Sequence, residues 1–177
     1  MIDNFESALQ GGHPNSLGNT IAVVDHVLAN HDRFDELFKC YFSKDEVVRL
    51  RVSNAMKRIA KAEKSLLVPY IDAFLDQIAQ IDQASTQWTL ANLFDFLNQE
   101  LSELQRTKAI KIMQHNLEHH TDWIVLNNTM DTLGKWAQKE SNGQDLKKWL
   151  TPHLKRLQND SRKSVAKRAS KWLDKLT

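Results

Sequence analysis

The chain has 177 residues, of which only 5 are Gly and 3 are Pro; 41% are hydrophobic, 26% are charged, and the formal net charge is +2. This composition is typical of a folded chain, and the shortage of turn formers argues against a β-sandwich or barrel, which needs a turn about every 8–12 residues. No apolar run approaches the roughly 18 residues that cross a bilayer. The sequence contains no glycine-rich phosphate loop.

The first residues lack the basic and apolar segments of a secretory signal. A single cysteine, Cys40, cannot form an intrachain disulfide. Its apolar neighbours suggest a buried helical thiol. From these features we expect a cytoplasmic protein without a membrane partner.

Residues 1–16 are interpreted as an N-terminal segment that ends in a loop at Gly11–Asn15. After it, apolar residues recur with the helical period and predict helices over 17–30, 33–42, 45–61, 65–80, 85–98, 101–118, 122–138, 145–158 and 161–176. Ser43 to Glu46 has the pattern of a capping box, with Ser43 as the expected cap. A loop is predicted around Gly143. The sequence therefore predicts an all-α protein with short connections.

Four segments share one apolar spacing, and each begins 38, 39 or 40 residues after the previous one. They are Val48-Val52-Met56-Ile59, Thr86-Leu90-Phe94-Leu97, Val125-Thr129-Leu133-Trp136 and Val165-Ala169-Leu173-Leu176. A repeat of about 40 residues that contains two helices is typical of an α-solenoid, in which neighbouring pairs bury a continuous core. A plain helical bundle is the alternative.

Asp45-Glu46-Val47-Val48-Arg49, followed by Val52 and Met56, resembles the inner helix of the HEAT-repeat family. Pro69 and Pro152 stand where that family often has a kinking proline. The resemblance covers about residues 17–176. It implies a right-handed α-α superhelix, a short solenoid of about four helix pairs plus an N-terminal cap, in one domain over 17–177. The family's arginine at Arg49 is replaced in the other copies by Gln87, Leu126 and Ala166.

The resemblance implies a non-enzymatic protein–protein interaction module without catalytic residues, metal or cofactor. The inner helices would be 45–61, 85–98, 122–138 and 161–176. Their exposed residues are expected to contact a protein partner, and the candidates are Arg51, Lys57, Arg58, Gln87, Asp95, Asn127, Asn128 and Asp131.

Charge is unevenly distributed along the chain. Residues 147–177 carry ten Lys and Arg against two acids, whereas 65–105 contain six acids and no Lys or Arg. The candidate basic patch is Lys155, Arg156, Arg162, Lys163, Lys167, Arg168, Lys171 and Lys175. Such a patch attracts nucleic acid through counterion release, without base specificity. The alternatives are a solvated cap on the solenoid and a surface for an acidic protein.

Other candidate sites have weaker patterns. HEAT-like alkylpurine DNA glycosylases use aromatic residues and a carboxylate, for which Trp88, Asp95 and Trp123 are loose candidates. His115, Glu118, His119 and His120 form a metal-capable cluster, but Asn116 stands where a metalloprotease helix has its glutamate. We expect Trp136 and Trp172 to pack in the core. For Trp88, Trp123 and Trp149, near predicted helix starts, core packing is favoured, and a half-exposed interface anchor is the alternative.

Overall fold

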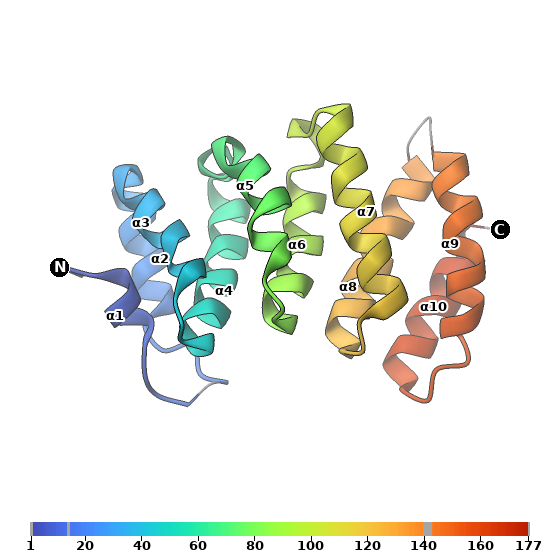
Figure 1. Cartoon of the computed structure of the whole chain (residues 1–177), viewed down its shortest axis with the longest axis horizontal. Coiled ribbons are helices and arrows are strands. Elements are labelled where there is room, and N and C mark those ends of the chain that lie inside the picture. The colour runs from blue at the N-terminus through green and yellow to red at the C-terminus, as the bar shows by residue number, and fades with distance from the viewer. Residues whose placement is uncertain (1, 14, 140–142, 177) are drawn as a thin grey trace. The chain divides into compact units, whose positions relative to one another are not determined.

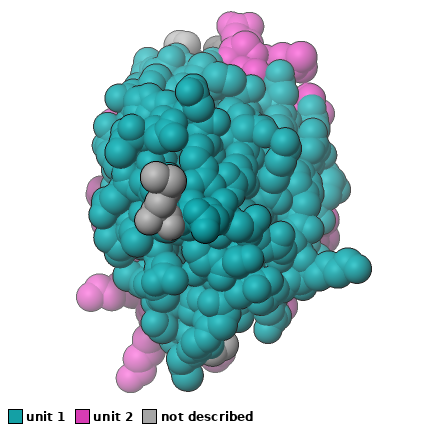
Figure 2. Space-filling view, turned by 90° about the vertical axis from the view of Figure 1, so that its left-hand side faces the viewer, with its two compact units in different colours: residues 1–101 teal, residues 102–177 magenta. Residues whose placement is uncertain are grey.

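The structure is a computed structural model that describes residues 2–13, 15–139 and 143–176. All regular structure in these ranges is helical (Figure 1). The chain divides into two compact units, which we call unit 1 (residues 1–101) and unit 2 (residues 102–177); Figure 2 colours them separately. Over the described ranges, no helix combines the length and the apolar character needed to cross a membrane.

The described residues of unit 1 form six α-helices with 3₁₀ turns between them. The helices are α1 (Phe5–Leu9), α2 (Thr20–Ala29), α3 (Phe34–Lys39), α4 (Glu46–Ala62), α5 (Ile71–Asp76) and α6 (Ala84–Phe96). Helix α4 packs between α2 and α6. Its core positions Val48, Val52, Met56 and Ile59 are fully buried, as the 3.6-residue apolar period predicts.

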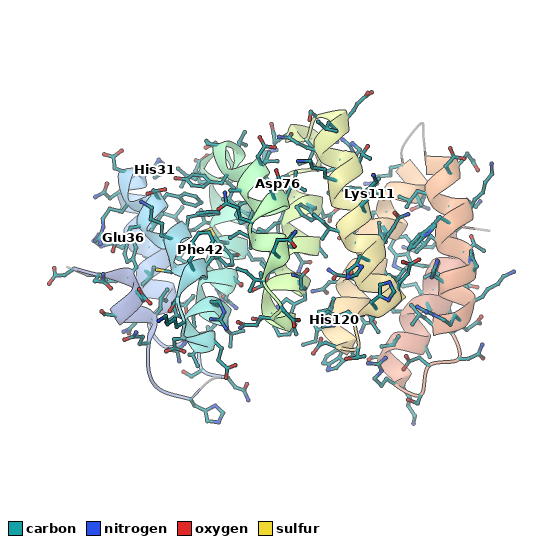
Figure 3. The ribbon with its side chains drawn as sticks, in the orientation of Figure 1. His31, Glu36, Phe42, Asp76, Lys111 and His120 are labelled. Atoms are coloured by element: carbon teal, nitrogen blue, oxygen red, sulfur yellow. The ribbon has the colours of Figure 1, made fainter. Side chains whose placement is uncertain are left out.

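The first residues of unit 1 are fixed to α3 by polar contacts. Glu36, labelled in Figure 3, accepts the backbone N–H of Phe5 at 3.0 Å and pairs with Arg33. Arg33 in turn donates to the carbonyl oxygens of Ile2 and Asp3, and its guanidinium lies 4.1 Å from the centre of the Phe5 ring. This network explains how a helix as short as α1 is held in place.

The described residues of unit 2 form four helices: α7 (Glu103–His119), α8 (Trp123–Lys139), α9 (Gly143–Leu157) and α10 (Lys163–Leu176). Helix α8 packs on the other three, and α9 packs on α10. Gly134 of α8 lies directly against the Trp172 ring of α10, so that a Cβ atom at position 134 would overlap the indole. The close approach of α8 and α10 therefore depends on this glycine.

The predicted repeat spacing agrees with the helix positions. Helices α4, α6, α8 and α10 begin at residues 46, 84, 123 and 163, so that each begins 38, 39 or 40 residues after the previous one. Fifteen of the sixteen aligned apolar positions are buried. The exception is Leu173, which is only partly buried, because Trp172 takes the core position of α10 instead.

Several local predictions were wrong. Asp45 rather than Ser43 caps α4, since its carboxylate accepts the Val47 N–H at 2.8 Å. Gly143 is the buried first residue of α9 and not a loop residue; Ser141 and Asn142 lie outside the described residues. The range 65–80 is not one helix but α5 flanked by 3₁₀ turns, with Pro69 in one of them. Helix α1 was not predicted.

Candidate functional site

Arg51, predicted to be exposed, is only 2% exposed. Its guanidinium donates five hydrogen bonds to backbone carbonyl oxygens of the N-terminal segment, those of Leu9, Gln10, Gly11, His13 and Ser16, at 2.6–3.3 Å. The segment folds over this face of α4 and covers the side chain. Helical periodicity places Arg51 beside Val52 but contains no information about a distant covering segment, which is why the prediction failed.

Two other candidates for the partner surface are also buried. Gln87 is 6% exposed, and its amide donates to the carbonyl oxygens of Ala79 and Ile81 at 3.1 and 2.8 Å. Asn127 is 5% exposed among the buried residues of α8. A polar residue on a helix is expected to face solvent. The sequence pattern does not reveal when such a side chain is instead buried against the backbone or between helices. Neither residue can contact a partner in this structure.

Asp131 holds α8 and α10 together instead of facing a partner. Its carboxylate accepts the indole N–H of Trp172 at 2.8 Å and forms an ion pair with Arg168. Both oxygens are therefore used inside unit 2. This bond pair and the Gly134 contact lie on the same side of α8, so they fix one helix interface.

The remaining candidates of the predicted partner surface differ in exposure. Arg58 is exposed and donates to Asn54 on its own helix at 2.7 Å. Lys57 is half-buried, and burial, with a smaller effect of Lys61 and Arg58, lowers its pKa. Asp95 and Asn128 are half-buried and already interact with other groups. These residues alone do not form a distinct binding surface within either unit.

Unit charge supports the predicted asymmetry. Unit 1 has fourteen Asp and Glu against nine Lys and Arg, a net charge of −5, and unit 2 has fifteen Lys and Arg against eight acids, a net charge of +7. Within unit 2, the arginines and the lysines of the basic patch have separate roles.

The three arginines of the patch make contacts inside unit 2. Arg156 donates to the carbonyl oxygen of Leu117 at 2.9 Å. Arg162 pairs with Asp160 and donates to the carbonyl oxygen of Thr121, and Arg168 pairs with Asp131. A planar guanidinium with several donors suits such multiple contacts better than an ammonium group does. The arginines are thus structural residues.

The lysines of α10 remain exposed. Lys163, Lys167, Lys171 and Lys175, which we call the lysine stripe, follow one another at intervals of four residues on the solvent side of α10. In the described part of the chain none of them forms an ion pair. Lys175 lies over the Trp172 ring at 4.9 Å. With a rise of 1.5 Å per residue, the stripe is about 18 Å long.

Two other exposed charged residues, Asp174 and Lys135, lie on α10 and on the helix packed against it. Asp174 is the exposed acid of α10. Lys135, one turn after Asp131 on α8, is exposed and adds a charge on the side that pairs with Arg168. Lys135 was not among the predicted candidates, although the offset of 40 residues that aligns the start of α8 with that of α10 aligns Lys135 with Lys175. Lys155, the last lysine of the patch, is exposed on α9.

The Asp160–Arg162 pair should make the stability of the fold depend on pH in the acid range. The hydrogen bonds from Arg162 lower the pKa of Asp160 from 3.8 to about 2. A depressed carboxyl pKa stabilises the folded state above pH 3.8, and this contribution disappears as the pH falls toward 2. Arg162→Gln should therefore unfold more easily than the wild type at neutral pH, and the difference should narrow toward pH 2, where only the hydrogen bond to Thr121 still separates the two. Acid titration followed by circular dichroism measures this; a gap that stays constant with pH would contradict it.

The predicted metal-capable cluster lies at the end of α7. The rings of His115 and His119 are 4.7 Å apart, and His119 lies 3.7 Å from Glu118. His120, labelled in Figure 3, accepts the backbone N–H of Asp122. Among the described residues, no group of three or more His, Cys, Asp or Glu side chains is placed to hold a metal ion.

A pocket of about 270 Å³ adjoins this cluster and is lined by residues that include His119, His120, Arg156 and Arg162. Because both arginines already bind carbonyl oxygens and Arg162 also binds Asp160, the polar groups of the pocket serve mainly to join the ends of α7, α9 and α10. The pocket does not present a set of unengaged charges to a ligand.

Cys40 has neither the exposure nor the low pKa of a reactive cysteine. Cys40 is buried, and burial, with smaller effects of Glu6 and Glu36, raises the pKa of its thiol to about 12. A protonated buried thiol is a poor nucleophile. Trp136 and Trp172 are buried at 1% and 3% exposure, as predicted, while Trp123 is 49% exposed and Trp88 and Trp149 are half-buried.

No protein-family model matches the sequence, and no curated protein sequence matches it significantly.

Proposed function

We propose that the chain is a non-enzymatic, HEAT-like binding module whose helix pairs follow a right-handed α-α superhelix. The even spacing of α4, α6, α8 and α10 supports this proposal, as does the burial of aligned positions in each of them. Repeats of this kind expose one helix of every pair as a rigid binding surface. A rigid surface binds through shape and charge and needs no bond chemistry.

The lysine stripe is the single observation that supports a binding face on α10. Lysines four residues apart on a helix repel one another, which destabilises the helix. A solvated cap would be equally soluble with alternating Lys and Glu, which attract at that spacing. The sequence instead keeps three successive like-charge pairs, with Asp174 as the one exposed acid of α10, and this arrangement favours an anionic macromolecule. The protein partner expected from the sequence would accordingly present an acidic surface, and nucleic acid is the other anionic class.

Neutralising the centre of the stripe should weaken binding of anionic macromolecules. We expect Lys167→Gln/Lys171→Gln to bind both polyglutamate and a short single-stranded oligonucleotide less tightly than the wild type does. Each lost phosphate contact lowers the slope of log K against log[salt] by about 1, so the slope for the oligonucleotide should fall by about 2. Fluorescence anisotropy across about 50–200 mM salt measures both quantities.

The matched control is Lys111→Gln/Lys155→Gln. It removes the same charge from exposed lysines of unit 2, on α7 and α9 rather than on α10. This variant should bind almost as the wild type does. The proposal is wrong if the control loses as much affinity as the stripe variant, or if the wild type binds neither polyanion at about 50 mM salt.

A further inference from the structure

We propose that the anionic partner is a single-stranded nucleic acid, whose phosphates contact the lysine stripe while one base stacks on Trp123. This inference rests on the proposed binding role of the stripe. It adds a second element of recognition that charge alone does not supply, and it names the chemical class of the partner.

Trp123 is the exposed aromatic residue of unit 2. Its side chain is 49% exposed, whereas Trp136 and Trp172 of the same unit are buried. A half-exposed indole presents a large apolar face to solvent, on which another planar group can stack. Bases stack on such faces whatever their identity, because every base has a π surface.

The position of Trp123 is fixed by the cap of α8. The Asp122 carboxylate accepts the backbone N–H groups of Ile124 and Val125 at 2.8 and 3.1 Å, and the Asp122 N–H donates to His120 at 3.0 Å. The first turn of the helix is therefore well defined. An aromatic residue on a fixed backbone loses little conformational entropy when a base stacks on it.

A contact of Arg162 places the start of α10 next to the residues before Trp123. Arg162 precedes the first lysine of the stripe and donates to the carbonyl oxygen of Thr121, two residues before Trp123. The starts of α8 and α10 are thus side by side. From this corner the lysine stripe runs about 18 Å along α10. A base at Trp123 would leave the following phosphates within reach of successive lysines.

The two elements together distinguish a single strand from other anions. An acidic polypeptide would satisfy the lysines but offers no regular planar group to the indole. In a duplex the base faces are already stacked on one another and cannot cover Trp123. A single strand has both exposed base faces and closely spaced phosphates. At one phosphate per about 3.4 Å of a stacked strand, some five phosphates would lie along the stripe.

The test compares three ligands on the intact chain: a single-stranded oligothymidylate of about ten nucleotides, the duplex of the same length, and polyglutamate. Trp123→Ala should weaken binding of the single strand by about 5- to 150-fold, the range for losing one base–aromatic stack. Polyglutamate binding should change by less than about 2-fold, because Trp123 carries no charge. Trp123→Phe retains a ring and should keep most of the affinity. Leu104→Ala, which truncates the 70% exposed Leu104 of α7, is the matched control and should have no effect.

Fluorescence of the unmodified protein gives a second measurement that needs no alanine variant. The oligonucleotide should quench the emission that Trp123→Phe removes, and inorganic polyphosphate should not. The inference is overturned if Trp123→Ala weakens polyglutamate and oligonucleotide equally, if it weakens neither, or if the duplex binds more tightly than the single strand. If the wild type binds no polyanion at all, the proposed function itself fails. Binding of polyglutamate that depends on the stripe but not on Trp123 overturns only the nucleic-acid inference.

Discussion

Arg51→Ala is expected to lower the free energy of unfolding by about 3–5 kcal/mol, because it breaks a buried network of several hydrogen bonds. The guanidinium is 2% exposed and donates to five backbone carbonyl oxygens of residues 9–16. Truncation leaves these carbonyl groups without their donor and opens a cavity beneath them. Urea unfolding measures the loss, and hydrogen exchange should show that the amides of residues 9–18 lose protection.

The control for Arg51 lies on the same helix. Arg58→Ala removes an exposed arginine that hydrogen-bonds Asn54 on its own helix, and should change stability by at most about 0.5 kcal/mol. Arg51→Lys keeps the charge but replaces a planar group with five donors by one with three. It should recover only part of the loss. Equal stability of Arg51→Ala and Arg58→Ala would show that the N-terminal segment does not depend on the guanidinium.

Gly134→Ala is expected to destabilise unit 2 by about 1–3 kcal/mol through overpacking. In an ordinary helix this change stabilises by roughly 1 kcal/mol because alanine is the better helix former. Here the new methyl group would overlap the buried indole of Trp172. The sign of the effect therefore distinguishes the α8–α10 contact from helix propensity, and thermal unfolding followed by circular dichroism measures it.

A double-mutant cycle isolates this contact. Trp172→Ala alone should destabilise by about 3–5 kcal/mol, since it removes a buried ring and leaves the Asp131 carboxylate with one donor fewer. In the Trp172→Ala background, Gly134→Ala should no longer be harmful, because the space for its methyl group is open. An additive cycle, with the same effect of Gly134→Ala in both backgrounds, would be inconsistent with the structure.

Local periodicity was sufficient to predict most helices. The stripes of α4, α6 and α8 are buried as expected, because a 3.6-residue apolar pattern needs no knowledge of what covers it. Trp172 and Leu173 are adjacent residues, and the apolar pattern does not show which of the two faces the core. The space for the Trp172 ring comes from Gly134 on another helix. The cap at Asp45 was missed for a similar reason, since Ser43 fits the same local motif.

The candidate site was less predictable because exposure depends on distant segments. Arg51 is covered by residues 9–16, and Asp131 is engaged by two side chains of α10. Neither contact can be predicted from the residues next to Arg51 or Asp131 in the sequence. The lysines of α10 were predictable, because the apolar positions of a strongly amphipathic helix identify the solvent side by exclusion.

The lysine stripe also makes unit 2 respond to ionic strength in two opposite ways. Salt screens repulsion among the four ammonium groups and so strengthens the last helix, which Val165, Ala169, Trp172 and Leu176 anchor by their burial. The same ions compete with any polyanion and so weaken binding. High salt thus stabilises α10 most and weakens its binding of polyanions most. At low salt a bound polyanion would itself reduce the repulsion among the lysines.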